Sequence, residues 1–246
     1  KLDDSSNKEM LKAARKYNEE LLKKADHWKL SKKDKKKYES LLDVSGTGIM
    51  GYIEIPKIDC SLPVYHGTDE GALQIAIGHL EGSSLPVGGK SSHCVLSGHR
   101  GLPSARLFTD LDQMEKGDIF ILHILGKHLA YKVDQIKTVL PDETSDLDII
   151  EGEDHVTLIT CTPYGVNTHR LLVRGVRTKY VVEDTKNDET IPQKLAVVDP
   201  KRVLAGGAAV LVVLILLIYL IVRHRDKKRK KKQLSERKEE AESDEK

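Results

Sequence analysis

Short runs of apolar and polar residues fill the middle of the chain, between residues 51 and 177. Several of these runs alternate apolar with polar positions, and turn residues separate them. A period of two is typical of β-strands that bury one face. The pattern predicts strands at GYIEIPKI (51–58), CSLPVYHG (60–67), HCVLSGH (93–99), DIFILHIL (118–125), HLAYKVDQIKTV (128–139), HVTLITC (155–161) and RLLVRGVR (170–177).

Many short strands, with one weak helical segment near ALQIAIGHL (72–80), predict a mainly β domain over residues 48–179. This spacing favours a closed or nearly closed β-barrel. The runs 118–125 and 128–139 are separated by Gly126 and Lys127, which predicts a hairpin with these two residues as its turn.

The first 47 residues follow a helical pattern instead. Apolar residues recur there at three- and four-residue spacing, at Met10, Ala14, Tyr17, Leu21 and Ala25. This spacing predicts an amphipathic helix whose apolar stripe needs a surface to lie on. A second, highly charged segment (31–48) ends in two glycines, which are typical of a helix stop and a linker.

The C-terminal region predicts a membrane anchor. Residues 203–222 are twenty uncharged, mostly apolar residues, which as a helix match the hydrocarbon core of a bilayer. A buried core helix would be shorter and would keep a polar face. The basic run 223–232 follows at once, so we expect the tail 223–246 to be cytoplasmic and the barrel to be extracellular. We expect residues 180–202 to form a polar stalk between barrel and membrane.

Composition narrows the function classes. Only 4% of the residues are aromatic, and the one concentrated basic run lies beyond the predicted span, so nucleic-acid binding is not indicated. Three widely spaced cysteines do not make a disulfide scaffold and leave at least one thiol free. No CxxC or paired-histidine spacing suggests zinc, and the acidic stretch 142–154 fits a solvated loop better than a calcium loop. We therefore expect no metal site.

Cys161 is the best candidate nucleophile. It ends the predicted strand 155–161, and the turn residues that follow present its side chain at a sheet rim. The strand that begins at Arg170 is long enough to return beside the first strand, so Arg170 can lie next to Cys161. A fixed cation beside a thiol lowers the thiol pKa and offers donors to an oxyanion.

A nucleophilic cysteine also needs an imidazole. His99 is the best placed of ten histidines, because it ends a strand-like run before Arg100 and Gly101, again at a rim. His93, His123, His128 and His155 fall inside or at the start of strands. Position alone does not choose firmly among the ten.

Several motifs together resemble the sortase family, the membrane-held cysteine transpeptidases of Gram-positive bacteria. They are TLITC (157–161) followed by TPYGVNTHRLLVRG (162–175), with LSGHRGLP (96–103), YIEIPKI (52–58) and LPVYHG (62–67). The resemblance covers about residues 48–178. The motif TPYGVNTHRLLVRG, the long N-terminal helical extension and the C-terminal membrane helix most resemble class C sortases, the pilus polymerases.

The resemblance implies an eight-stranded barrel and a cysteine mechanism without a cofactor. Cys161 would attack the Thr-Gly bond of an LPxTG-like sorting signal, His99 would protonate the leaving amine, and Arg170 would stabilise the oxyanion or position the signal. Thr160 would help to line the site. A lysine of another pilin subunit would then resolve the thioacyl enzyme.

Class C enzymes also carry a lid with an Asp-Pro-aromatic motif. Here the corresponding residues 25–28 read Ala-Asp-His-Trp, so Asp26 and Trp28 match and His27 replaces the proline. The indole of Trp28 would fill an apolar groove while Asp26 approaches Arg170 or the thiol. Losing the proline predicts a looser lid, which full protection of residues 20–45 from proteolysis would contradict.

Alternatives remain at this stage. A sortase that attaches proteins to the cell wall would use a peptidoglycan precursor amine in place of a pilin lysine. A catalytically idle, membrane-tethered barrel would bind sorting signals or pilins as a scaffold, although it would not need the thiol. Cys60 and Cys94 are expected to be buried strand cysteines, and a disulfide between them is not required by anything in the sequence.

Overall fold

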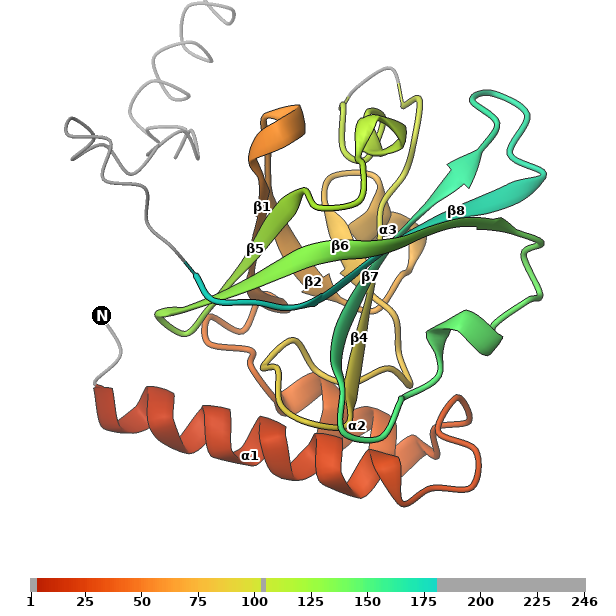
Figure 1. The fold of residues 1–246 in the computed structure, drawn as a ribbon. Helices are drawn as coiled ribbons and strands as arrows, with labels where there is room; N and C mark the ends of the chain where they lie inside the picture. Colours follow the sequence, from red (N-terminus) through yellow and green to blue (C-terminus); the bar gives the residue numbers. More distant parts are fainter. Residues whose placement is uncertain (1–3, 103–104, 181–246) are drawn as a thin grey trace, which may run out of the picture. The chain divides into compact units, whose positions relative to one another are not determined.

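The computed structural model describes residues 4–102 and 105–180, and within these ranges eight strands close into a barrel (Figure 1). The strand order around the barrel is β1-β2-β3-β4-β7-β8-β6-β5. The pairs β2/β3 and β4/β7 are parallel, and the other pairs are antiparallel. The strands are β1 (Ile49–Ile55), β2 (Cys60–His66), β3 (Ile77–His79), β4 (Ser92–Ser97), β5 (Ile119–Ile124), β6 (Lys127–Val139), β7 (Asp154–Thr162) and β8 (His169–Arg177).

The mainly β barrel predicted from the sequence is confirmed, and several details differ. The predicted strand 51–58 ends at Ile55, and Pro56–Ile58 form a 3-10 helix, η1. The strand β3 was not predicted, because its three residues lie inside the segment 72–80 that was read as weakly helical. Only the first two residues of that segment belong to a helix, α3 (Glu70–Leu73). The hairpin between β5 and β6 turns at Leu125 and Gly126 rather than at Gly126 and Lys127. Both turn residues have positive φ, 47° and 75°, which a two-residue turn between twisted strands requires.

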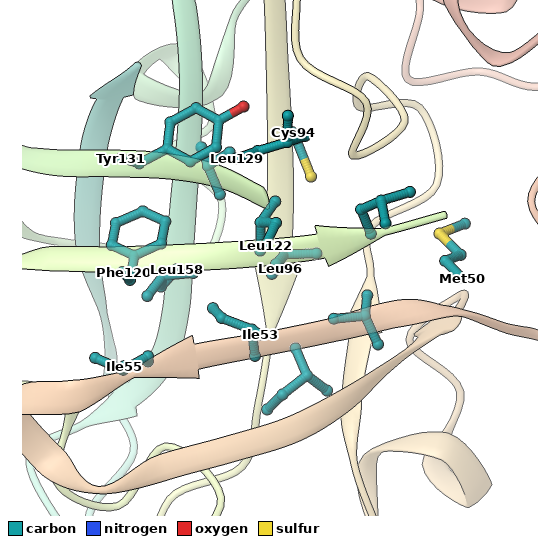
Figure 2. Close-up of a cluster of buried hydrophobic side chains, with 14 of the residues drawn as sticks. Met50, Ile53, Ile55, Cys94, Leu96, Phe120, Leu122, Leu129, Tyr131 and Leu158 are labelled. Carbon is teal, nitrogen blue, oxygen red and sulfur yellow. The ribbon is translucent and has the colours of Figure 1, made fainter. Parts of the chain in front are cut away.

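The barrel interior is a continuous apolar core. Phe120 and Tyr131 stack with ring centroids 5.7 Å apart, and Gly175 lies against the Phe120 ring, where a Cβ atom would come within 2.7 Å. Figure 2 shows part of this core, which includes Met50, Ile53, Ile55, Cys94, Leu96, Phe120, Leu122, Leu129, Tyr131 and Leu158. The core fixes the strands whose outward faces carry the site.

The N-terminal extension packs on the barrel through α1 (Asp4–Leu22) and α2 (Lys32–Ser40). The predicted stripe is confirmed at Ala14, Tyr17 and Leu21, which are buried. At its ends the prediction was wrong, because Leu11 is buried rather than Met10, and Ala25 lies exposed beyond the end of the helix. Asn18 fixes the position of α1 on the barrel, because its side-chain amide donates to the carbonyl of Leu85 at 3.1 Å and accepts the Leu85 N–H at 2.8 Å.

Short 3-10 helices complete the described residues: η1 (Pro56–Ile58), η2 (Leu111–Gln113) and η3 (Ser145–Leu147). No helix in the part of the chain that the structure describes is long and apolar enough to cross a bilayer. The predicted span 203–222, the stalk from residue 181 on and the tail 223–246 lie outside the described residues.

Candidate active site

The β7–β8 hairpin places Cys161 opposite Arg170. The two residues are Cα partners in the antiparallel register, and Ile159 and Leu172 form the pair two positions further along. Because side chains alternate along a strand, all four project from the same face of the sheet. That face is the outer one, since Ile159 and Leu172 belong to an apolar cluster separate from the barrel core. The pairing expected for Cys161 and Arg170 is therefore present.

His99 reaches the same place from a different strand. The strand β4 runs parallel to β7 with Ser97 paired to Ile159, and the amide of Gly98 donates to the Ile159 carbonyl at 3.0 Å. Continuing this register by two residues brings His99 level with Cys161. The fold thus brings the three predicted residues to one end of three neighbouring strands.

Thr160 contacts the backbone next to His99 and does not face the site. Its side chain is buried, and its hydroxyl donates to the carbonyl of Gly98 at 2.8 Å, directly before His99. This differs from the groove-lining position that the resemblance implied, because alternation turns Thr160 to the opposite face from Cys161. Thr160 therefore ties β7 to the start of the histidine loop.

The guanidinium of Arg170 is held by its own turn. Its Nη1 donates to the carbonyls of Asn167 and His169, at 3.2 and 3.1 Å. Asn167 has a φ of 61°, a left-handed conformation that asparagine tolerates better than most residues. These bonds hold the guanidinium at the end of the hairpin where Arg170 pairs with Cys161.

The other two thiols are unsuited to nucleophilic attack. All three cysteines are free, so the disulfide left open by the sequence is not formed. Burial raises the pKa of Cys60 to about 12 and raises the pKa of Cys94 well above its ordinary value. Cys161 is only partly buried. Accessibility therefore selects Cys161.

Trp28 packs on the outer apolar cluster, which consists of Val95, Leu147, Ile159 and Leu172. Its indole N–H donates to the carboxylate of Asp148 at 3.4 Å. The Ile159–Leu172 pair lies two residues, about 7 Å of strand, from Cys161 and Arg170. The indole thus packs on the same outer cluster as the Ile159–Leu172 pair, and its role as a lid stays a prediction.

Asp26 does not approach Arg170 or the thiol. Its side chain is exposed, forms an ion pair with Lys29 at 3.0 Å and accepts the backbone N–H of Trp28 at 3.1 Å. The hydrogen bond from Lys29 lowers the pKa of Asp26. Asp26 therefore shapes the turn that presents Trp28, and the expected contact with the site is corrected.

His27, which replaces the proline, anchors this segment. Its Nδ1 donates to the carbonyl of Gly82 at 2.8 Å. Gly82 has a φ of 92°, and a Cβ there would come within 2.8 Å of the His27 carbonyl oxygen. Sequence reasoning missed Gly82 and Asp148 as partners of the lid segment, since each is far from it along the chain. The segment 23–31 is therefore attached at two points, a feature that the looser-lid prediction did not include.

No group of three or more histidine, cysteine or acidic side chains among the described residues is arranged to hold a metal ion. The acidic stretch 142–154 makes other contacts. Asp146 forms an ion pair with Lys137 at 2.5 Å, and Asp148 is the acceptor of the indole N–H.

Comparison with known proteins agrees with this geometry. The sortase domain family matches residues 53–178. The crystal structure of sortase C1 from Streptococcus agalactiae is 52% identical with a TM-score of 0.72, covering 73% of this chain and 93% of that one. Sortase C of Clostridium perfringens, solved with the C-terminal cell wall sorting motif, is 46% identical with a TM-score of 0.64, covering 73% and 92%. Sortase D of Bacillus subtilis is 32% identical over 130 residues, which span 52% of this chain and 63% of the relative. The chain belongs to the sortase family of cysteine transpeptidases.

Proposed function

We propose that this protein is a class C sortase that polymerises pilin subunits. It cleaves an LPxTG-like sorting signal between Thr and Gly and joins the threonine to a lysine amine of another subunit. The observation that carries the proposal is the pairing of Cys161 with Arg170, together with the β4–β7 register, whose last pair, Ser97 and Ile159, lies two residues before His99 and Cys161. The similarity to two sortase C structures and the Trp28 segment on the outer cluster support the class assignment.

In the first step the Cys161 thiolate attacks the carbonyl carbon of the threonine. Arg170 stabilises the oxyanion of the tetrahedral intermediate, and His99 gives its proton to the leaving glycine amine. The C–N bond breaks, and a thioester between Cys161 and the threonine remains. In the second step a neutral lysine amine attacks this thioester, His99 takes its proton, and the Cys161 thiolate leaves. The product is an isopeptide bond.

The protein is proposed to work outside the cell, held by residues 203–222, with the segment 23–31 as a lid over the outer apolar cluster. The apolar cluster that Trp28 occupies is suited to the leucine and proline of a sorting signal, so lid and signal would compete for it.

A transfer assay tests the proposal. The protein is incubated with a pilin subunit that carries its sorting signal, and mass spectrometry searches for a threonine-to-lysine isopeptide bond, with Cys161→Ala as control. A Cys161-dependent bond between subunits supports pilus polymerisation. Transfer to a glycine-type amine alone would favour the wall-anchoring alternative, and polymer formation by Cys161→Ala would favour a scaffold.

A further inference from the structure

Arg100 follows His99 directly and carries a buried charge outside the three proposed catalytic residues. Its side chain is 9% exposed and forms an ion pair with Asp112 in η2. The Nε of Arg100 is buried without a hydrogen-bond partner. A buried guanidinium with an unsatisfied N–H contributes little net stability, so the arrangement is better explained by what it positions.

The same guanidinium reaches the turn that follows Cys161. Its Nη1 lies 3.5 Å from the hydroxyl of Thr162, and its Cζ lies 5.7 Å from the centre of the Tyr164 ring. Gly101 also packs against the Tyr164 ring. A Cβ atom at this position would lie 3.0 Å from the ring, and the φ of 79° is one that residues other than glycine rarely adopt. The histidine loop and the β7–β8 turn are therefore packed together through Arg100 and Gly101.

His99 depends on this packing. Its carbonyl accepts the amide of Phe108 at 3.1 Å, but within residues 4–102 and 105–180 its ring makes no hydrogen bond. The placement of the ring relative to Cys161 is then set by the loop that carries it. A histidine that transfers a proton must be held to within about 0.5 Å of its productive position.

We propose that Arg100 is a positioning residue, which clamps the His99 loop onto the Cys161 turn and so sets the distance between imidazole and thiol. The inference rests on the proposed function. The fork of the guanidinium is essential to it, because one end holds Asp112 while the other faces Thr162 and the Tyr164 ring. A lysine keeps the charge but has neither the fork nor the planar stacking surface.

The test uses Arg100→Lys in the full chain, with an LPETG peptide between a fluorophore and a quencher as donor and hydroxylamine as acceptor. Each variant is measured with the native lid and with Trp28→Ala. Positioning predicts a fall in kcat of about 10- to 100-fold, little change in the KM of the peptide, and an unchanged pH profile. Arg106→Lys is the matched control, since Arg106 lies in the same loop, is 77% exposed and pairs with Asp110 within its own segment. It should keep full activity.

Each outcome decides the inference. A selective fall in kcat for Arg100→Lys, with thermal unfolding close to that of Arg106→Lys, supports positioning. Full activity in Arg100→Lys together with a loss and a shifted pH profile in Arg100→Ala would overturn it and assign Arg100 an electrostatic role. If the unsubstituted protein cleaves the peptide and both Arg100 variants cleave equally well, the inference fails while the proposed function stands. If neither lid background cleaves the peptide, both fail.

Discussion

The indole N–H of Trp28 donates to Asp148 at 3.4 Å although the two residues are 120 positions apart in the chain. This contact joins the N-terminal segment to the loop after β6, beside the face that carries Cys161. If the segment 23–31 acts as the proposed lid, a sorting signal must displace Trp28 from the apolar cluster, and this competition can be measured.

Trp28→Ala should raise kcat/KM for a sorting-signal peptide about tenfold, because losing the contacts of a partly buried indole removes on the order of 1.5 kcal/mol from the closed state. Peptide cleavage kinetics measure the effect. Leu22→Ala is the control, since Leu22 is a similarly apolar but 43% exposed residue at the end of α1. Equal rates in both variants would mean that Trp28 does not compete with the signal.

Gly82→Ala should release the segment 23–31 without a change in Trp28 itself. The added Cβ would come within 2.8 Å of the His27 carbonyl oxygen, so the segment must move away. Limited proteolysis should then cut residues 23–31 several-fold faster. Gly89→Ala separates this contact from backbone strain, because Gly89 also has a positive φ, 125°, but has nothing within 4 Å of the added Cβ. Faster cutting in both variants would point to strain alone.

Stability should fall in mild acid because two histidines are buried in neutral form. Burial lowers the pKa of His79 and of His93 from 6.5 to about 4. Between these values the unfolded chain binds protons that the folded chain does not, so stability is lost as pH falls from about 6.5 to about 4, by about 1 kcal/mol per pH unit for each histidine.

Denaturant unfolding at a series of pH values checks this dependence. His93→Gln should make it shallower, since His93 donates through Nδ1 to the carbonyl of Asp148 at 2.8 Å and accepts from Thr157 at 2.7 Å in its neutral form. A slope unchanged by the substitution would assign the acid sensitivity to other groups.

Alkylation should distinguish the three thiols. At neutral pH a small haloacetamide is expected to modify Cys161 in the native protein and to leave Cys60 and Cys94 unmodified, because burial raises the pKa of both and shields them. Peptide mapping by mass spectrometry gives the sites, and denatured protein, in which all three react, is the control. Rapid labelling of Cys94 would show that the barrel opens far more often than its packing indicates.

The pairing of Cys161 with Arg170 could be predicted from the sequence, whereas the contacts of the segment 23–31 could not. Cys161 and Arg170 could be paired in advance, because strand alternation and a hairpin are local features. The lid contacts could not be, since Gly82 and Asp148 meet the segment 23–31 only through the tertiary fold. The strand β3 was missed for a different reason, because its three residues, Ile77–His79, are too few to show a period.

The same logic explains the error at Asp26. Motif similarity suggested a long-range partner, but Lys29 and the backbone of Trp28 are closer along the chain and satisfy the carboxylate locally. Arg100 was visible in the sequence beside His99, yet its contacts with Asp112 and Tyr164 depend on how two loops pack. The sequence position of a residue therefore predicted its contacts where a strand set its direction, and did not predict them where two loops pack together.

The parallel pairing of β4 with β7 also has a consequence for the order of folding. The bond from Thr160 to Gly98 joins residues 62 positions apart, so the imidazole meets the thiol only after a long loop has closed. The strand β8, which brings Arg170, is the last to be synthesised of those in the barrel. Before the barrel is complete, Cys161 therefore lacks the strand neighbours that place His99 and Arg170, and the three residues come together only in the last stage of folding.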